Sequence, residues 1–346
     1  MRRGGEAAVP MTVERSRTRD VLLALVLAAS GGASVAADPA APGEMVERVL
    51  SGIVELRATA PENARTAPFL GTERRGSGVV IDATGLIVTI GYLILEADAV
   101  EIVVAESPVP AEVVAYDYTT GLGLVRATGP LGVAPLKLGD SDALSESDGV
   151  IVAAFGGLAG AQPGLIVSRR DFAGYWEYIL EGAIFTAPPH PGFAGAALLG
   201  GRGELLGIGY LVVGDAIEGR PLPGNMFVPV NRLKPILGEL LTDGRSAGPP
   251  RPWLGLFAQA YESRVFVVRV ASDGPAEAAG IASGDLILGV GDTPVRSLFE
   301  FYRAVWALGT PGVEVPLVVL NETGIAQRRV RSGDRYDWLI SHPGRR

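Results

Sequence analysis

The sequence predicts a mainly β chain, in which two sets of short strands precede a smaller α+β module. Short runs of β-branched residues recur between Gly and Pro residues, which is the pattern of barrels or sandwiches. Residues 245–252, RSAGPPRP, are small, basic or Pro and predict a linker. The chain has 346 residues, 48% of them hydrophobic, so it can bury the cores of two or three domains.

The first 37 residues are predicted to form a signal peptide. Three arginines within residues 15–19 precede the apolar run VLLALVLAA (21–29), and the small residues Ser34 and Ala36 fit a cleavage site. The apolar run is short for a membrane span, which favours a cleaved signal peptide. An uncleaved membrane anchor is the alternative. We therefore expect an exported protein, located in the periplasm or the cell envelope.

Residues 38–244 contain the two sets of predicted strands. The segment GSGVVIDATGLIVTI (76–90) predicts a hairpin with its turn at residues 83–85. Residues 100–117 predict two strands around a Pro-containing turn, and residues 121–127 predict one more. A second set is predicted by GVIVAAF, GLIVSRRDF, WEYILEGAIF, GAALLGGRGELLGIGYLVV and NMFVPVN. Residues 231–244 then show helical spacing of apolar residues, ending at Gly244.

Residues 253–346 predict a separate α+β module. WLGLFAQ, RVFVVRVA, DLILGVGDTPV and VEVPLVVL have strand character, while residues 274–281 and 297–309 predict helices. The last of these helices carries Leu298, Phe301, Tyr302 and Val305 on one broad face. The spacing does not decide which of them face the core of the module and which face a binding groove.

Composition excludes several classes of function. The net charge of -8 lacks the basic footprint of a nucleic-acid-binding protein. The absence of cysteine excludes thiol catalysis, disulfides and zinc–thiolate sites. Only two histidines, His190 and His342, are present, which makes histidine-rich metal sites difficult to build. We expect no metal, no cofactor and no nucleic-acid partner.

Several segments, taken in order, resemble the HtrA/DegP family of exported serine proteases. They are GSGVVID in the first hairpin, LGDSDAL (138–144), GRGELLGIGY (201–210), and FVPVNRLKPIL followed by WLGL at 253–256. The similarity covers about residues 45–335. It implies a trypsin-like double β-barrel over residues 38–244, the linker at 245–252, and a C-terminal PDZ domain over 253–346.

The resemblance also places the catalytic triad of the family on this sequence, where all three positions differ. The histidine position falls at Tyr92 in TIGYLI, the aspartate position at Gly121 in GLGLV, and the serine position at Ala194 in GFAGAAL. A Ser-His-Asp triad needs a hydroxyl to attack, an imidazole to take its proton, and a carboxylate to orient the imidazole. None of the three replacements can supply the corresponding group.

The loop before Ala194 contains groups that could support residual chemistry. Backbone N–H groups make an oxyanion hole, so Gly192 and Ala194 are expected to retain an anion-binding pocket. His190 is predicted to be a solvated loop residue, and a rescued mechanism built on it is the alternative. Phe193 either fills the vacant nucleophile position or is an exposed loop aromatic.

The PDZ resemblance implies a site for peptide C termini. In Trp253-Leu254-Gly255-Leu256, successive backbone N–H groups would converge on a terminal carboxylate, and Gly255 permits close approach. The peptide is expected to pair with the free edge of a strand at 263–270, by β-augmentation. The predicted peptide-binding residues also include Val265, Phe266, Val267, Phe301 and Val305.

These observations predict an exported, inactive HtrA-like pseudoprotease that binds protein C termini or unfolded segments as a scaffold, chaperone or regulatory subunit. A homotrimer or a mixed oligomer with an active relative is a further expectation from the resemblance. One alternative is a working serine endopeptidase with a nonstandard site. The other is a structural interaction protein in which the PDZ groove is vestigial.

Overall fold

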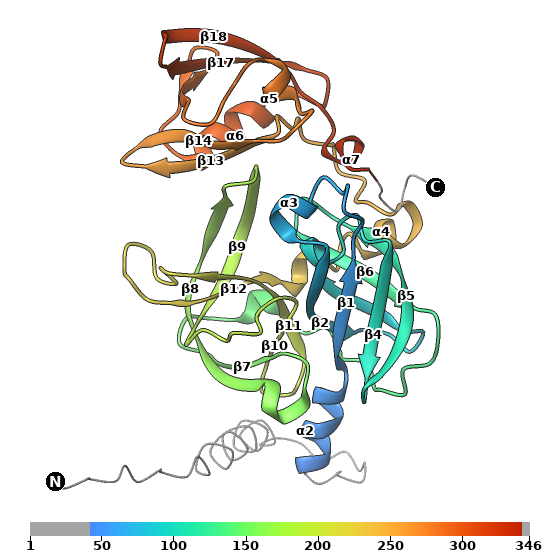
Figure 1. Ribbon diagram of the computed structural model, residues 1–346. Helices are drawn as coiled ribbons and strands as arrows, with labels where there is room; N and C mark the ends of the chain where they lie inside the picture. Colours follow the sequence, from blue (N-terminus) through green and yellow to red (C-terminus); the bar gives the residue numbers. More distant parts are fainter. Residues whose placement is uncertain (1–41, 341–346) are drawn as a thin grey trace, which may run out of the picture.

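The computed structural model describes residues 42–340, so the predicted signal peptide, residues 1–37, lies outside the described residues. The first domain begins with helix α2 (Pro42–Ser51) and then forms a closed barrel in the strand order β1-β2-β3-β6-β5-β4 (Figure 1). Its strands are β1 (Ile53–Thr59), β2 (Glu73–Val80), β3 (Leu86–Ile90), β4 (Ala99–Val104), β5 (Ser107–Tyr116) and β6 (Leu122–Ala127). The hairpin predicted at 76–90 is therefore confirmed as β2 and β3.

A second closed barrel follows, in the strand order β10-β11-β12-β9-β8-β7. Its strands are β7 (Gly149–Ala153), β8 (Ala161–Gly174), β9 (Tyr178–Ala187), β10 (Ala197–Leu199), β11 (Leu205–Val213) and β12 (Gly224–Pro229). The β8–β9 hairpin is longer than its neighbours and extends out of the barrel to the third domain (Figure 1). Its tip, residues 174–177, is called the hairpin tip below.

The third domain is an antiparallel sheet in the order β13-β14-β15-β17-β18, with β16 beside β15. Its strands are β13 (Leu256–Tyr261), β14 (Arg264–Val270), β15 (Leu286–Val290), β16 (Thr293–Pro294), β17 (Glu314–Asn321) and β18 (Gly324–Arg331). Helix α6 (Leu298–Trp306) packs on it, and Ser297 caps the helix by accepting a hydrogen bond from the Glu300 N–H. The expected mainly β fold, a trypsin-like double barrel followed by a PDZ domain, is confirmed.

Short helices lie between the strands, and one, α7, follows the last strand. They are α3 (Ala67–Leu70), η1 (Gly91–Leu93), η2 (Ser141–Ala143), η3 (Gly157–Gly160), η4 (Val230–Arg232), α4 (Leu237–Asp243), α5 (Pro275–Ala278) and α7 (Arg335–Trp338). The single helix predicted over 231–244 was wrong in extent, because Pro235 separates η4 from α4. The predicted cap was correct, since Gly244 adopts the left-handed conformation that ends α4. The turn before β5 is formed by Ala105 and Glu106, not by a proline.

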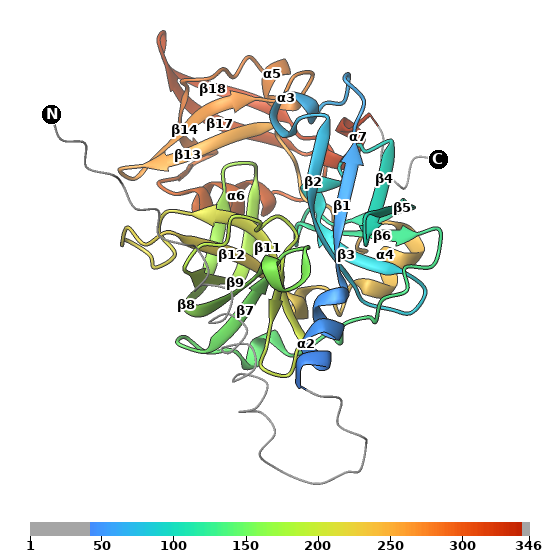
Figure 2. The same ribbon diagram turned by 60° about the horizontal axis from the view of Figure 1, so that its bottom comes forward.

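The C-terminal segment ties the PDZ domain to the first barrel, and Figure 2 shows α7 beside that barrel from a second angle. The Tyr336 hydroxyl of α7 donates to the Tyr116 carbonyl at 3.0 Å, and the two rings stack. The Ile340 N–H donates to the buried Glu96 carboxylate at 2.7 Å. Within residues 42–340, no helix has the length and apolar character needed to cross a membrane.

Candidate functional site

Two of the three predicted triad positions line one cleft between the barrels. Tyr92 lies in η1 directly after β3, and Gly121 directly precedes β6. The Gly91 N–H donates to the Gly121 carbonyl at 2.7 Å, which brings the two segments together. Ala194 lies in the loop before β10, and its carbonyl accepts from the Ser77 N–H at 2.8 Å. Its neighbour Phe193 lines the same cleft as Tyr92 and Gly121.

Tyr92 is held as a structural residue. Its hydroxyl donates to the Tyr210 carbonyl at 3.1 Å, and its ring stacks on the Tyr210 ring with centroids 5.8 Å apart. Burial raises the pKa of Tyr92 far above its ordinary value, which leaves the phenol protonated at neutral pH. A protonated phenol that already donates its hydrogen bond cannot act as the base of a triad.

The position of Gly121 leaves little room for a side chain. Its φ of +79° lies in the left-handed region. A Cβ atom there would lie 3.0 Å from Tyr210 Cε1 and 3.2 Å from the Tyr178 hydroxyl. The Tyr178 hydroxyl itself donates to the Thr120 carbonyl at 2.6 Å. Aromatic side chains therefore take the space that a carboxylate at this position would need.

The predicted anion pocket is wrong for Gly192 in this structure. The Gly192 N–H donates to Nδ1 of His190 at 3.0 Å, so it is not directed at a ligand. The expectation that His190 is solvated is also wrong, since the residue is 8% exposed. Its N–H donates to Asn225 Oδ1 at 2.6 Å, and burial lowers the pKa of its imidazole. His190 therefore acts as a neutral acceptor that shapes this loop.

The cleft itself is an aromatic cavity of about 290 Å³. Among the described residues that line it, there is no serine, cysteine or histidine. It is lined by Phe69, Leu70, Gly91, Tyr92, Leu95, Tyr116, Asp117, Tyr118, Gly121, Tyr175, Trp176, Phe193, Tyr210, Leu211, Phe257 and Arg335. Phe193 is half-buried and lines this cavity, so it is not the exposed loop aromatic of the alternative. The cavity can hold an apolar group, but its walls offer no nucleophile paired with a base.

The loop Trp253-Leu254-Gly255-Leu256 has the geometry expected of a carboxylate-binding loop. Gly255 has a φ of +78°, and its carbonyl accepts from the Ala271 N–H at 2.8 Å. This turn directs the N–H groups of Leu254 and Leu256 to a single point. They donate to the two oxygens of one carboxylate, that of Glu177, at 2.9 and 2.8 Å. The loop therefore binds a carboxylate through its backbone.

Glu177 comes from the other domain, at the hairpin tip. It is 8% exposed and adopts a φ of +56°, which is unfavourable for a non-glycine residue. Burial raises the pKa of its carboxyl to about 7, while the N–H groups of Leu254 and Leu256 and the Arg335 guanidinium oppose that rise.

The strand that offers a free edge to a peptide is β13, not the strand predicted at 263–270. That segment is β14, which pairs with β13 on one side and β15 on the other. A strand paired on both edges has no groups left for β-augmentation. Of the predicted residues on β14, Val265 and Val267 are buried in the PDZ core and Phe266 is half-buried.

Phe301 and Val305 of α6 also belong to the PDZ core, with 0% and 1% of their surface exposed. The residue of α6 that contacts the hairpin tip is Tyr302. Its hydroxyl donates to the Gly174 carbonyl at 2.9 Å and accepts from the Glu177 N–H at 3.3 Å.

Sequence reasoning did not single out Glu177 or Ala258, and it left the role of Tyr302 open. Glu177 is separated by 77 residues from the Leu254 N–H that it binds, so no local pattern reports the contact. One signal was available: the acidic residue ends AGYWE, an aromatic turn between two long apolar strands. A carboxylate at the tip of such a hairpin is a candidate for a contact outside its own barrel.

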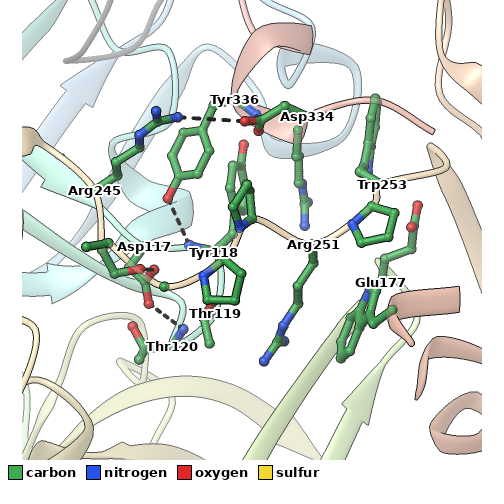
Figure 3. A pocket seen from close by; sticks show the side chains of 18 of the residues that line it. Asp117, Tyr118, Thr119, Thr120, Glu177, Arg245, Arg251, Trp253, Asp334 and Tyr336 are labelled. Carbon is green, nitrogen blue, oxygen red and sulfur yellow. Dashed lines mark hydrogen bonds and ion pairs between the residues drawn. The ribbon is translucent and has the colours of Figure 1, made fainter. Parts of the chain in front are cut away.

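A second cavity, of about 470 Å³, lies between the first barrel, the linker and the PDZ domain. Figure 3 shows Glu177 and Trp253 on one side of it and the Arg245–Asp334 pair on another. The Arg251 guanidinium lies 4.1 Å from the centroid of the Trp306 ring, and burial lowers its pKa. The linker residues 245–252 therefore help to form the interface between the domains.

Comparisons with known proteins agree with this architecture. Residues 76–208 match the model of the trypsin-like peptidase domain, and residues 252–325 match that of the PDZ domain. The chain is 27% identical over 270 residues to the serine protease Do-like HtrA of Lactobacillus helveticus, with 69% of this chain and 63% of that protein covered. It is 28% identical over 265 residues to the periplasmic serine endoprotease DegP of Salmonella typhimurium, with 71% and 54% covered.

The chain thus spans about half to two thirds of the length of these relatives. Among solved structures, a substituted form of the HtrA-type protease AlgW with a tripeptide has a TM-score of 0.50 at 20% identity, covering 86% of this chain and 98% of that one. The last comparison shows the fold alone. Together, the comparisons show a chain similar to HtrA-type serine proteases, with a trypsin-like peptidase domain followed by a PDZ domain.

Proposed function

We propose that this protein is an exported, proteolytically inactive relative of HtrA-type proteases, which binds protein C termini or unfolded segments through its PDZ domain. It would act as a scaffold, a chaperone or a regulatory subunit, either as a homotrimer or in a mixed assembly with an active relative. The domain boundaries proposed for this role are 38–244 for the barrels, 245–252 for the linker and 253–346 for the PDZ domain.

The proposal of inactivity is supported by the chemistry of the cleft. Loss of the nucleophile or the base of a triad costs about 10⁶-fold in turnover, because the members act as a unit. Here Ala194 has no hydroxyl, and the Tyr92 phenol is protonated and engaged with Tyr210. A preformed oxyanion hole would leave some residual catalysis. That contribution is also reduced, because the Gly192 N–H donates to His190.

The proposal of C-terminal peptide binding is carried by one observation. The backbone N–H groups of Leu254 and Leu256 hold both oxygens of a carboxylate beside the free edge of β13. A peptide C terminus presents the same chemical group, followed by a backbone that can pair with a strand edge. The affinity of such a site is expected to be about micromolar, or about -8 kcal/mol.

Two experiments test the proposed function. In the first, unfolded casein is incubated with the purified mature protein, and new peptides are sought by mass spectrometry. No cleavage is expected. Casein cleavage that cannot be traced to a contaminating protease would show that the protein is an active enzyme with a nonstandard site. In the second, a library of peptides with free and amidated C termini is screened, and binding is expected to require the free carboxylate.

A further inference from the structure

The hairpin tip occupies the PDZ groove in the manner of a bound peptide. The first element of this likeness is the Glu177 carboxylate, held by the N–H groups of Leu254 and Leu256. The second lies two residues earlier, where the Tyr175 carbonyl accepts from the N–H of Ala258 on β13 at 2.8 Å. The groove therefore binds the tip through a carboxylate at one end and a strand-edge hydrogen bond at the other.

The two contacts are spaced alike on both sides of the groove. Residues 175–177 form the turn between β8 and β9, and this turn presents the Tyr175 carbonyl and the Glu177 carboxylate two residues apart. On the PDZ side, Ala258 likewise lies two residues after Leu256. The contacting groups are therefore two residues apart on both partners, which is the spacing expected for a peptide that pairs with a strand edge.

Further contacts fix the tip in the groove. Tyr302 of α6 bonds to the backbone at both ends of the tip, through the Gly174 carbonyl and the Glu177 N–H. Arg335 of α7 donates to the Trp176 carbonyl at 3.2 Å. The left-handed backbone of Glu177 is a conformation that costs about 1–2 kcal/mol and persists only where surrounding contacts impose it.

We infer that the hairpin tip, residues 174–177, is an internal ligand of the PDZ groove, and that a peptide C terminus binds there only by displacing it. The Glu177 side chain stands in for the terminal carboxylate of the partner. This inference rests on the proposed function for the identity of the external ligand, but the seating of the tip can be tested without that ligand. The partner is accordingly an extended segment that ends in a free carboxylate and outcompetes the tip.

Displacement of the tip has a consequence inside the barrel cleft. The Trp176 ring stacks on Tyr178 and lies edge-on to Tyr210, with centroids 5.5 and 5.7 Å apart. Tyr210 in turn stacks on Tyr92. Tyr175 and Trp176 both line the aromatic cavity of the cleft. A peptide that removes the tip from the PDZ groove therefore also changes the wall of that cavity.

The first test measures peptide binding to the full mature chain. The probe is a fluorescent pentapeptide, Ala-Gly-Tyr-Trp-Val, which copies residues 173–176 and ends in a free carboxylate. The variant Glu177→Ala is expected to bind it at least tenfold more tightly than the wild type, while the amidated probe binds neither. Glu181→Ala is the matched control, because Glu181 lies on the same strand β9 but is exposed and paired with Arg232. Equal affinity of wild type and Glu177→Ala would overturn the internal-ligand inference while leaving the proposed function intact.

The second test needs no peptide. Hydrogen exchange of the Leu254, Leu256 and Ala258 amides is measured in the wild type, in Glu177→Ala and in Tyr302→Phe. The Tyr302→Phe variant is a milder change, which removes only the hydroxyl that contacts the hairpin tip. Exchange is expected to be slow in the wild type and at least tenfold faster in both variants. If neither the wild type nor the variants bind the probe or the peptide library, but exchange rises as expected, the proposed function is wrong while the inference that the hairpin tip occupies the groove is retained. Unchanged exchange in both variants would overturn the seated tip.

Discussion

The barrel cleft and the PDZ groove both contain side chains of the chain itself at the positions where a ligand would act, but with different consequences for chemistry. In the cleft, the Tyr92 and Tyr210 rings stack on each other and line an aromatic cavity of about 290 Å³. In the groove, the Glu177 carboxylate satisfies the N–H groups of the binding loop without altering them. Under the proposed function, the cleft would need new side chains to become a protease site. The groove needs only the departure of its internal occupant.

This difference reflects which atoms carry each function. Triad catalysis depends on three particular side chains, so three substitutions are enough to remove it. Carboxylate binding by a PDZ loop depends on backbone N–H groups and on one glycine, Gly255, that permits the turn. Backbone geometry tolerates most sequence changes around it, so a site of this kind is harder to remove by substitution than a triad.

The largest effect tests the cleft. The triple variant Tyr92→His, Gly121→Asp, Ala194→Ser restores the triad residues, yet casein hydrolysis is expected to stay at least about 10³-fold below that of an intact HtrA-type protease assayed alongside. The Gly121→Asp side chain meets Tyr210 at 3.0 Å, and the Gly192 N–H is directed at His190. Circular dichroism and probe binding serve as controls for folding. Turnover within about tenfold of the reference protease would show that the cleft retains more of its machinery than its geometry indicates.

A tenfold effect is expected from pH, and it tests the groove. Burial raises the pKa of Glu177 from 4.5 to about 7 when the tip is seated, so the seated state binds a proton more readily than the open state. The extra stability of the seated tip is therefore complete below pH 4.5 and is lost as the pH rises through 7. Probe affinity should increase by about tenfold between pH 6 and pH 8, because opening becomes easier.

The groups around Glu177 make this assignment testable. Those that face it are Arg335 of α7 and Tyr302 of α6, with Asp117, Arg245, Arg251 and Asp334 across the interdomain cavity. Fluorescence anisotropy measured from pH 6 to pH 8 reports the affinity. Glu177→Gln should abolish the pH dependence, and an equally steep profile in that variant would assign the effect to another group.

The sequence predicted the architecture well and the occupied groove poorly. Periodicity and turn residues located the strands of all three domains, since these patterns depend on neighbours in the chain. The carboxylate-binding loop at 253–256 could also be predicted from local sequence, because Gly255 marks its turn. The contact between Glu177 and that loop joins two domains, and no pattern along the chain reports it. The free edge at β13 and the burial of His190 were missed for the same reason, because pairing and burial are set by tertiary packing.

The smallest effect concerns the rim of the domain interface. Arg65 of the first barrel and Asp273 of the PDZ domain form an ion pair at 2.9 Å, with the Asp273 side chain 78% exposed. Exposed pairs of this kind contribute about 0.2–1 kcal/mol, so Asp273→Asn should change probe affinity by less than about threefold. Asn also suits the left-handed backbone of residue 273, which has a φ of +55°. If this variant instead increased affinity as much as Glu177→Ala does, the rim and not the hairpin tip would hold the groove closed. The small effect expected here, beside the large one at Glu177, would assign control of the groove to the buried carboxylate.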